Sequence, residues 1–213
     1  SCDTQNNYLG TATAISCTQE ADPYILSGCG LVYTEGNFVK DVSFEIIDST
    51  PESGIDGYTT YRILINLTEQ AQNVYALAGN STVPLVIPPA YQVDAPFGNN
   101  IGPVNSAFFA SSPNSQWDSW LNIGGSIDGM STIGIEFNNW NERIGLDVSN
   151  GAIFWMDPAA GPGGDNILIA QLTIKNNIIE SHRTFSGLLQ GKSIGGGPDW
   201  QEEFSIDIPR PVE

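Results

Sequence analysis

The run Phe38–Ile47 reads FVKDVSFEII and alternates apolar with polar side chains. Successive side chains of a β-strand point to opposite faces, so this alternation places Val42, Phe44 and Ile46 on one face and polar or charged residues on the other. The run Tyr61–Leu67 repeats the pattern. Both runs predict half-buried β-strands, and they decide the fold class.

Further β-prone runs continue through the chain, separated by breakers that contain Gly and Pro. They cover residues 83–87, 117–123, 133–137, 152–156, 166–175, 184–190 and 203–208. One segment, 69–78, has helical character, but we expect a strand in it because its neighbours are strands. Many short strands with regular turn signals predict an all-β fold, an antiparallel β-sandwich or jelly-roll-like structure with little helix.

We expect one β-sandwich domain over residues 1–213, with 1–30 as a cysteine-containing N-terminal segment. Residues 88–116 are rich in Pro, Asn and Ser and form a long loop, which in a compact domain is usually functional or crosses the surface. The side chains that we expect in the core are Phe44, Ile46, Phe154, Trp155, Leu172 and Ile174.

The chain is strongly acidic: 7 Lys and Arg stand against 24 Asp and Glu, a net charge of −17. Such a surface repels nucleic acid and anionic membranes. No apolar stretch is long enough to span a bilayer. We therefore expect no nucleic-acid partner and no membrane insertion, and the dispersed acidic residues are typical of a solvated surface.

The three cysteines, Cys2, Cys17 and Cys29, lie near the N-terminus, and none forms a CxxC pair. His182 is the single histidine, so no Cys/His zinc site is predicted. In a secreted chain two of the three cysteines would pair. Cys17 and Cys29 close the shortest loop, and Cys2 is the alternative partner.

Two acceptor sequons for N-glycosylation support export of the chain, one at Asn66 and one at Asn80. The chain begins Ser1-Cys2-Asp3, as a mature protein does after removal of a signal peptide. These features predict a secreted, extracellular or cell-surface glycoprotein.

The Gly-rich stretch 157–166 has Asp157 at one end and Asp165 and Asn166 at the other. Calcium prefers carboxylate and carbonyl oxygens, and a Gly-rich loop exposes carbonyls, so these three residues are candidate calcium ligands. A hairpin loop with Asp at its corners explains the same residues without a metal.

Trp117 and Trp120 are candidates for stacking against a sugar ring. They are three residues apart, so on a strand they would point to opposite faces, one in the core and the other exposed. Packing in the core is the default role of large aromatic residues in a β-sandwich.

No catalytic residues are predicted. Glu202 and Glu203 are adjacent and would point to opposite faces of a strand, so they cannot form the facing carboxylate pair of a glycoside hydrolase. The chain has no GxSxG nucleophile motif for His182 to serve.

Several motifs in the second part of the chain together resemble a recurrent, largely uncharacterised β-domain of secreted and surface proteins from marine microalgae and marine bacteria. They are VYALAG (74–79), PPAYQ (88–92), APFG (95–98), WDSW (117–120), GAIFWMDP (151–158), IAQLT (169–173) and QGKS (190–193). The resemblance implies a secreted or cell-surface protein. It brings no activity and no catalytic residue to this chain.

Three classes of function remain open. The first is a non-catalytic extracellular structural or assembly subunit of a filament, surface layer or cell covering, because no catalytic set is evident and sheet edges can pair with neighbours. The second is a calcium-assisted carbohydrate-binding module. The third, a glycan-processing enzyme, lacks an evident carboxylate pair. The expected partners are further copies, other surface proteins or a polysaccharide.

The N-terminal stretch 1–18 holds few large apolar residues and one short β-prone run, 11–15. It cannot build a core of its own. We expect it to form an edge strand held by a disulfide, or to complete the sheet of a neighbouring subunit by strand addition.

Overall fold

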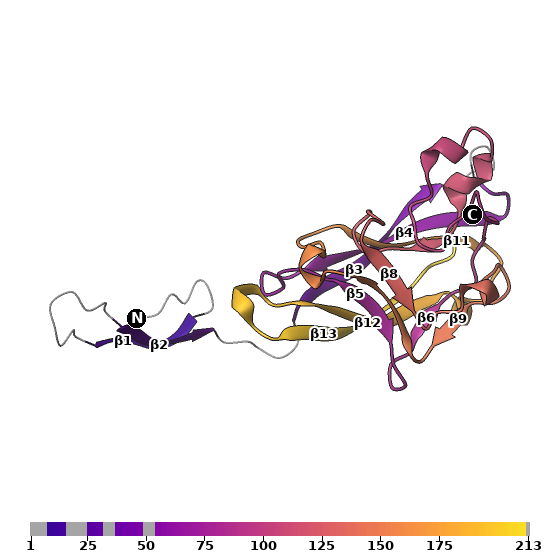
Figure 1. Ribbon diagram of the computed structural model, residues 1–213. Coiled ribbons are helices and arrows are strands. Elements are labelled where there is room, and N and C mark those ends of the chain that lie inside the picture. Colours follow the sequence, from indigo (N-terminus) through magenta and orange to yellow (C-terminus); the bar gives the residue numbers. More distant parts are fainter. Residues whose placement is uncertain (1–7, 16–24, 32–36, 49–53, 212–213) are drawn as a thin grey trace. The chain divides into compact units, whose positions relative to one another are not determined.

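The computed structural model describes residues 8–15, 25–31, 37–48 and 54–211. The chain divides into two compact units, Ser1–Asn37 and Phe38–Glu213. In the first unit β1 (Tyr8–Ile15) pairs antiparallel with β2 (Ile25–Leu31), so the β-prone run near the N-terminus finds a partner within its own chain (Figure 1). Cys2 and Cys17 lie outside the described residues, and the disulfide stays a prediction.

The second unit contains two antiparallel sheets. One has four strands in the order β3-β4-β11-β7. Their bounds are β3 (Val39–Asp48), β4 (Tyr58–Leu67), β11 (Ile167–Lys175) and β7 (Trp120–Leu121). The two long central strands, β4 and β11, come from the runs whose sequence pattern predicts strands.

The other sheet has seven strands. Six follow the order β8-β10-β5-β12-β6-β9, and β13 pairs with the remaining edge of β12. The bounds are β8 (Met130–Ile133), β10 (Gly151–Trp155), β5 (Ala76–Gly79), β12 (Thr184–Lys192), β6 (Leu85–Ile87), β9 (Leu146–Val148) and β13 (Asp199–Asp207). The helices in the described part of the chain are short 3₁₀ turns. The predicted all-β antiparallel sandwich is confirmed.

The core lies between the two sheets, and β4 shows how the sequence builds it. Tyr61, Ile63 and Ile65 alternate along β4 and are fully buried. On the neighbouring β11, Leu172 and Ile174 are also fully buried, as predicted. No helix in the described part of the chain is long and apolar enough to cross a membrane.

The prediction that two residues of β3 lie in the core is wrong. Phe44 is 36% exposed and Ile46 is 48% exposed. They stand in register with Ile63 and Tyr61 of β4, so they point to the core side. However, β3 is the edge strand of its sheet, and these side chains extend past the well-covered centre of the sandwich.

Other strand predictions also need correction. The run 117–123 contains only β7, because Pro113–Trp117 forms a 3₁₀ turn. The run 133–137 shares only Ile133 with β8. Phe154 and Trp155 belong to β10 but are half-buried rather than core. The predicted loop 88–116 is irregular apart from its 3₁₀ turns, and it runs close to β4 and β11 (Figure 1).

Candidate functional site

The outer face of the four-stranded sheet carries a row of three large polar or aromatic side chains. Gln171 of β11 stands in register with Arg62 of β4 on one side and with Trp120 of β7 on the other. Their chain neighbours Tyr61 and Leu172 are core residues. Because side chains alternate along a strand, Arg62, Gln171 and Trp120 face away from the core.

The loop before β7 folds over this row and is held there by Gln171. The Gln171 side-chain amide donates to the carbonyl oxygens of Gln116 (3.0 Å) and Asp118 (2.9 Å). A pocket of about 190 Å³ remains between loop and sheet, which we call the aromatic pocket. Its lining residues are Ile47, Arg62, Pro103, Val104, Phe109, Ser115, Gln116, Trp117, Trp120 and Gln171.

Both predicted sugar-stacking residues line the aromatic pocket. Trp117 is half-buried at the end of a 3₁₀ turn, and Trp120 is 2% exposed on β7. The expectation that they point to opposite faces of one strand is wrong, because Trp117 lies in a 3₁₀ turn and only Trp120 is on a strand. Trp120 lies against the backbone at Gly102, where an added Cβ would come within 2.1 Å of the indole ring, so only glycine fits there.

Hydrogen bonding separates these two tryptophans from the other three. The other indole N–H groups each donate to a backbone carbonyl: Trp140 to Pro88 (2.9 Å), Trp155 to Ile123 (3.1 Å) and Trp200 to Lys192 (3.1 Å). Within the described residues, the indole N–H groups of Trp117 and Trp120 have no acceptor. A buried indole N–H usually finds a partner, so these two donors are available to a ligand.

Ser115 is a third unsatisfied polar group in the wall of this pocket. Ser115 is fully buried, and its side-chain Oγ has no hydrogen-bond partner among the described residues. In the described part of the chain it is the single sealed side-chain polar atom in this state. Buried polar atoms are normally paired, so this hydroxyl is an exception, and it lies in the wall of the pocket.

Among the described residues that line the pocket, Arg62 is the only charged one. Its Nε donates to Oε1 of Gln171 at 3.3 Å. Glu45 is its register partner on β3, but no ion pair of Arg62 occurs within the part of the chain that the structure describes. The described residues of the lining include no Asp, Glu or His, the usual groups for acid–base catalysis.

Asp118 anchors the same loop from beneath. It is fully buried, and its carboxylate accepts the backbone N–H groups of Val93 (2.8 Å) and Asn99 (2.7 Å). Burial raises the pKa of the Asp118 carboxyl to about 6, against the opposing effect of these backbone donors. Asp118 thereby ties the segment 93–99 to the strand that carries Trp120.

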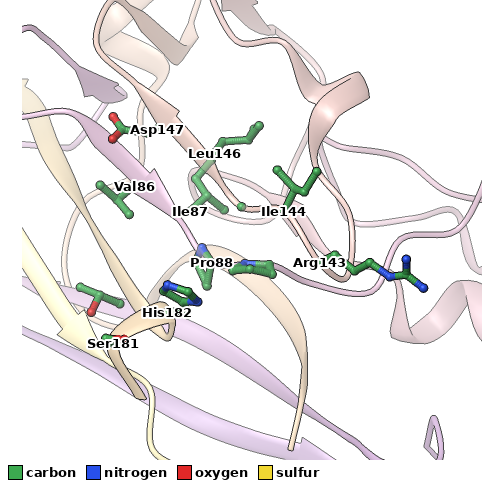
Figure 2. A pocket seen from close by; sticks show the side chains of 12 residues that line it. Val86, Ile87, Pro88, Arg143, Ile144, Leu146, Asp147, Ser181 and His182 are labelled. Atoms are coloured by element: carbon green, nitrogen blue, oxygen red, sulfur yellow. The ribbon is translucent and has the colours of Figure 1, made fainter. Parts of the chain in front are cut away.

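A larger pocket of about 360 Å³ lies beside β6 and is mostly apolar. β6 and β12 pair at Val86 and Ser186. The pocket is lined by Val86 and Ile87 of β6 and by Thr184 of β12. Figure 2 shows Ser181 and His182 near one another in its lining, whereas the Arg143 side chain points away from the other residues. Ser181 and His182 are exposed, and no hydrogen bond between their side chains occurs among the described contacts, so they form no nucleophile–base pair.

The predicted calcium ligands Asp157, Asp165 and Asn166 are exposed, and the loop between them has other contacts. Asp157 Oδ1 accepts the backbone N–H of Ala159, and Asn166 donates its backbone N–H to Asn66. The carbonyls of Pro162 and Gly164 accept backbone N–H groups of Val74 and Leu67. No cluster of three or more His, Cys, Asp or Glu suited to a metal occurs among the described residues. Calcium binding here stays a prediction.

The two sequons differ in their surroundings. Asn66 belongs to strand β4, and its side-chain nitrogen donates to Oδ1 of Asp41 on the neighbouring strand β3 at 2.7 Å. Asn80 is exposed in a turn, where its side-chain oxygen accepts the backbone N–H groups of Thr82 and Val83. Asn80 therefore presents its amide nitrogen more freely than Asn66 does.

Sequence reasoning missed Arg62, Gln171 and Phe109 as members of the pocket. The two polar residues sit at outward positions of strands β4 and β11. A polar side chain at the outward position of a central strand is the signal that could have found them. Comparisons with protein-family models, with curated proteins and with solved structures found no match.

Proposed function

We propose that the unit Phe38–Glu213 is a non-catalytic carbohydrate-binding module of an extracellular protein. The observation that carries the proposal is the convergence of Trp117 and Trp120, both with unpaired indole N–H groups, on one pocket. The resemblance to secreted marine domains and the exposed sequon at Asn80 support the extracellular setting.

The chemistry of the pocket suits a sugar. Aromatic side chains provide an apolar contact for the C–H face of a sugar ring, and a few placed polar groups bind its hydroxyls. Here Trp117 and Phe109 supply apolar surface, and Arg62 and Gln116 supply polar groups. Pockets for drug-sized ligands measure about 300–1,000 Å³, so one of about 190 Å³ suits a single sugar residue.

Two features support a binding rather than a hydrolytic role. Glycoside hydrolysis uses a pair of carboxylic residues, and none is found among the lining residues that the structure describes. Glu202, one of the carboxylates weighed from sequence, accepts the backbone N–H groups of Phe38 (2.7 Å) and Val39 (2.8 Å). It therefore joins the two sheets where Phe38 stacks on Trp200.

Indole N–H signals in a ¹⁵N–¹H spectrum test this proposal, because the chain has five tryptophans and their signals can be resolved. On titration with a panel of monosaccharides and oligosaccharides, we expect the signals of Trp117 and Trp120 to shift and those of Trp140 and Trp200 to stay. Trp117→Ala should weaken binding about tenfold or more, since loss of a stacked ring and a donor costs about 1.5 kcal/mol or more.

Ile144→Ala is the matched control, because it removes an exposed apolar side chain from the larger pocket instead. It should leave sugar binding unchanged. Repeating the titration with calcium and with EDTA measures any contribution of the 157–166 loop. Binding that is lost in Ile144→Ala and kept in Trp117→Ala would place the site in the larger pocket and contradict the proposal.

A second candidate, assembly through a sheet edge, is favoured by β3. It is an edge strand whose side chains Phe44, Ile46 and Ile47 are 36%, 48% and 37% exposed. Exposed apolar edge strands are sites of pairing with another chain. Bulges after Val39 and after Ile46 leave a regular stretch for such pairing, and the partner that we propose is β3 of a second copy, antiparallel across a two-fold axis.

Sedimentation velocity over a range of concentrations tests this second candidate. We expect the wild type to associate reversibly and Phe44→Asp to remain monomeric, because a charge in the apolar row disfavours pairing. Ile133→Asp is the control, since Ile133 is 65% exposed on β8 at the edge of the other sheet. A wild-type monomer at every concentration would remove the assembly candidate.

A further inference from the structure

We propose that the aromatic pocket selects sugars that carry an anionic group, a carboxylate or a sulfate, and that Arg62 binds this group. The inference rests on the carbohydrate-binding function proposed above and names the class of sugar. It comes from the guanidinium of Arg62, which has unused hydrogen-bond donors and no ion pair within the described residues.

Arg62 is held in place by a network that leaves most of its donors unused. Gln171 donates to the carbonyls of Gln116 and Asp118, which fixes its amide, and its Oε1 accepts Nε of Arg62. A guanidinium has five N–H donors, and this contact uses one. The two Nη groups have no acceptor among the described residues and form the fork that binds a carboxylate or sulfate through two hydrogen bonds.

No acidic residue of the described chain neutralises this arginine, although the protein has 24 Asp and Glu. The ion pairs in the described part join Lys192 to Asp199 and Arg143 to Glu142. Glu45, the register partner of Arg62, is exposed and forms no ion pair with it. Within the described part of the chain, an anionic ligand therefore meets no carboxylate already paired with Arg62.

The surroundings of Arg62 strengthen such a contact. The other described lining residues are neutral, and several are apolar, including Val104, Phe109 and Trp120. Low-dielectric walls make an interaction between opposite charges stronger than it is in water. A sugar ring held against the aromatic residues with its acidic group toward Arg62 satisfies both parts of the pocket.

Charge and size favour a ligand that places one acidic sugar residue in the pocket. The net charge of −17 repels a polyanion, whereas a single acidic residue carries little charge. Salt at about 0.15 M screens charges beyond about 8 Å, so the long-range repulsion fades while the contact with Arg62 remains. A pocket of about 190 Å³ holds about one sugar residue.

Titration of the full chain with three matched probes tests the inference through the indole signals of Trp117 and Trp120. The probes are methyl glucoside, methyl glucuronide and methyl glucoside 6-sulfate, which differ only at C6. We expect one or both acidic probes to bind about tenfold or more tighter than the neutral one, as charge-assisted hydrogen bonds allow. The stronger acidic probe identifies carboxylate or sulfate as the source.

Arg62→Gln should reduce binding of the preferred acidic probe about tenfold or more and leave that of methyl glucoside within about threefold. Arg62→Lys keeps the charge but loses the planar fork, so it should bind the acidic probe more weakly than the wild type and more tightly than Arg62→Gln. It replaces Arg62→Gln in this test if that variant does not fold. Arg143→Gln makes the same change of net charge at an exposed arginine outside this pocket and should have no effect.

Equal binding of all three probes by the wild type, or an acidic preference that survives in Arg62→Gln, would overturn this inference and leave the carbohydrate-binding proposal standing. If none of the probes and none of the wider sugar panel shifts the signals of Trp117 and Trp120, both proposals fall together.

Discussion

Arg183→Met is expected to lower the free energy of unfolding by about 3–5 kcal/mol, the largest effect that we predict for a single substitution. Arg183 is fully buried, and its guanidinium donates to three carbonyls: those of Lys175 (3.0 Å), Ile208 (2.8 Å) and Pro209 (2.7 Å). It also donates to the hydroxyl of Tyr61 at 3.1 Å. Without it the buried Ile208 carbonyl loses its partner, at a cost of about 1–3 kcal/mol, and the carbonyls of Lys175 and Pro209 each lose one of their two donors.

The effect of Arg183 comes from the position of its donors as well as from its charge. Its side chain ties the segment after β13 to the end of β11, with the guanidinium carbon 5.7 Å from the centre of the Tyr61 ring. Lysine has three donors on a single nitrogen and cannot reach these acceptors in the same way, so Arg183→Lys should recover little stability.

Urea unfolding followed by circular dichroism measures the change, with the slope used to check that the transition remains two-state. Arg210→Met is the control, because Arg210 is exposed in the same tail and the change in net charge is identical. It should alter stability by no more than about 0.5 kcal/mol. A loss of less than 1 kcal/mol in Arg183→Met would contradict the structural role assigned to the buried guanidinium.

Ionisation of Asp118 is expected to lower the free energy of unfolding by roughly 3 kcal/mol as the pH rises from about 4 to above 6. Burial raises the pKa of its carboxyl from the ordinary value of 3.8 to about 6. The folded state therefore holds this proton more tightly than the unfolded chain does. The stabilisation by the proton is complete below pH about 4 and is lost as the pH rises through about 6.

Asp118→Asn isolates this contribution from the other carboxylates, because an amide does not ionise. Its –NH₂ group would face one of the two backbone donors, of Val93 or Asn99, which costs about 1–3 kcal/mol at every pH. We expect the variant to be less stable than the wild type at pH 4 and the two to converge toward pH 7. Urea unfolding at several pH values measures both curves, and parallel curves would contradict a raised pKa.

Much of the sandwich could be predicted from local pattern. The alternation of Tyr61, Ile63 and Ile65 places their side chains in the core, and Leu172 and Ile174 follow the same rule on β11. A strand repeats every two residues whatever its neighbours are, so the sequence alone assigns these faces.

The candidate site could be predicted only in part. Trp117 and Trp120 could be named from their residue type, but Arg62 and Gln171 could not be linked to them. Those residues meet because β4, β11 and β7 lie side by side in one register. Pairing of strands far apart in the sequence leaves little trace in the local pattern of either strand.

The sequence by itself determined the all-β class, the acidic surface and the direction in which most strand residues point. Tertiary structure alone decided which of those faces are covered. Phe44 and Ile46 point to the core side but lie on an edge strand, so they stay exposed, whereas Arg183 is buried because the tail after β13 supplies carbonyls around it. The physical reason is that side-chain direction depends on adjacent peptide units, while burial and hydrogen-bond partners depend on which distant segments pack there.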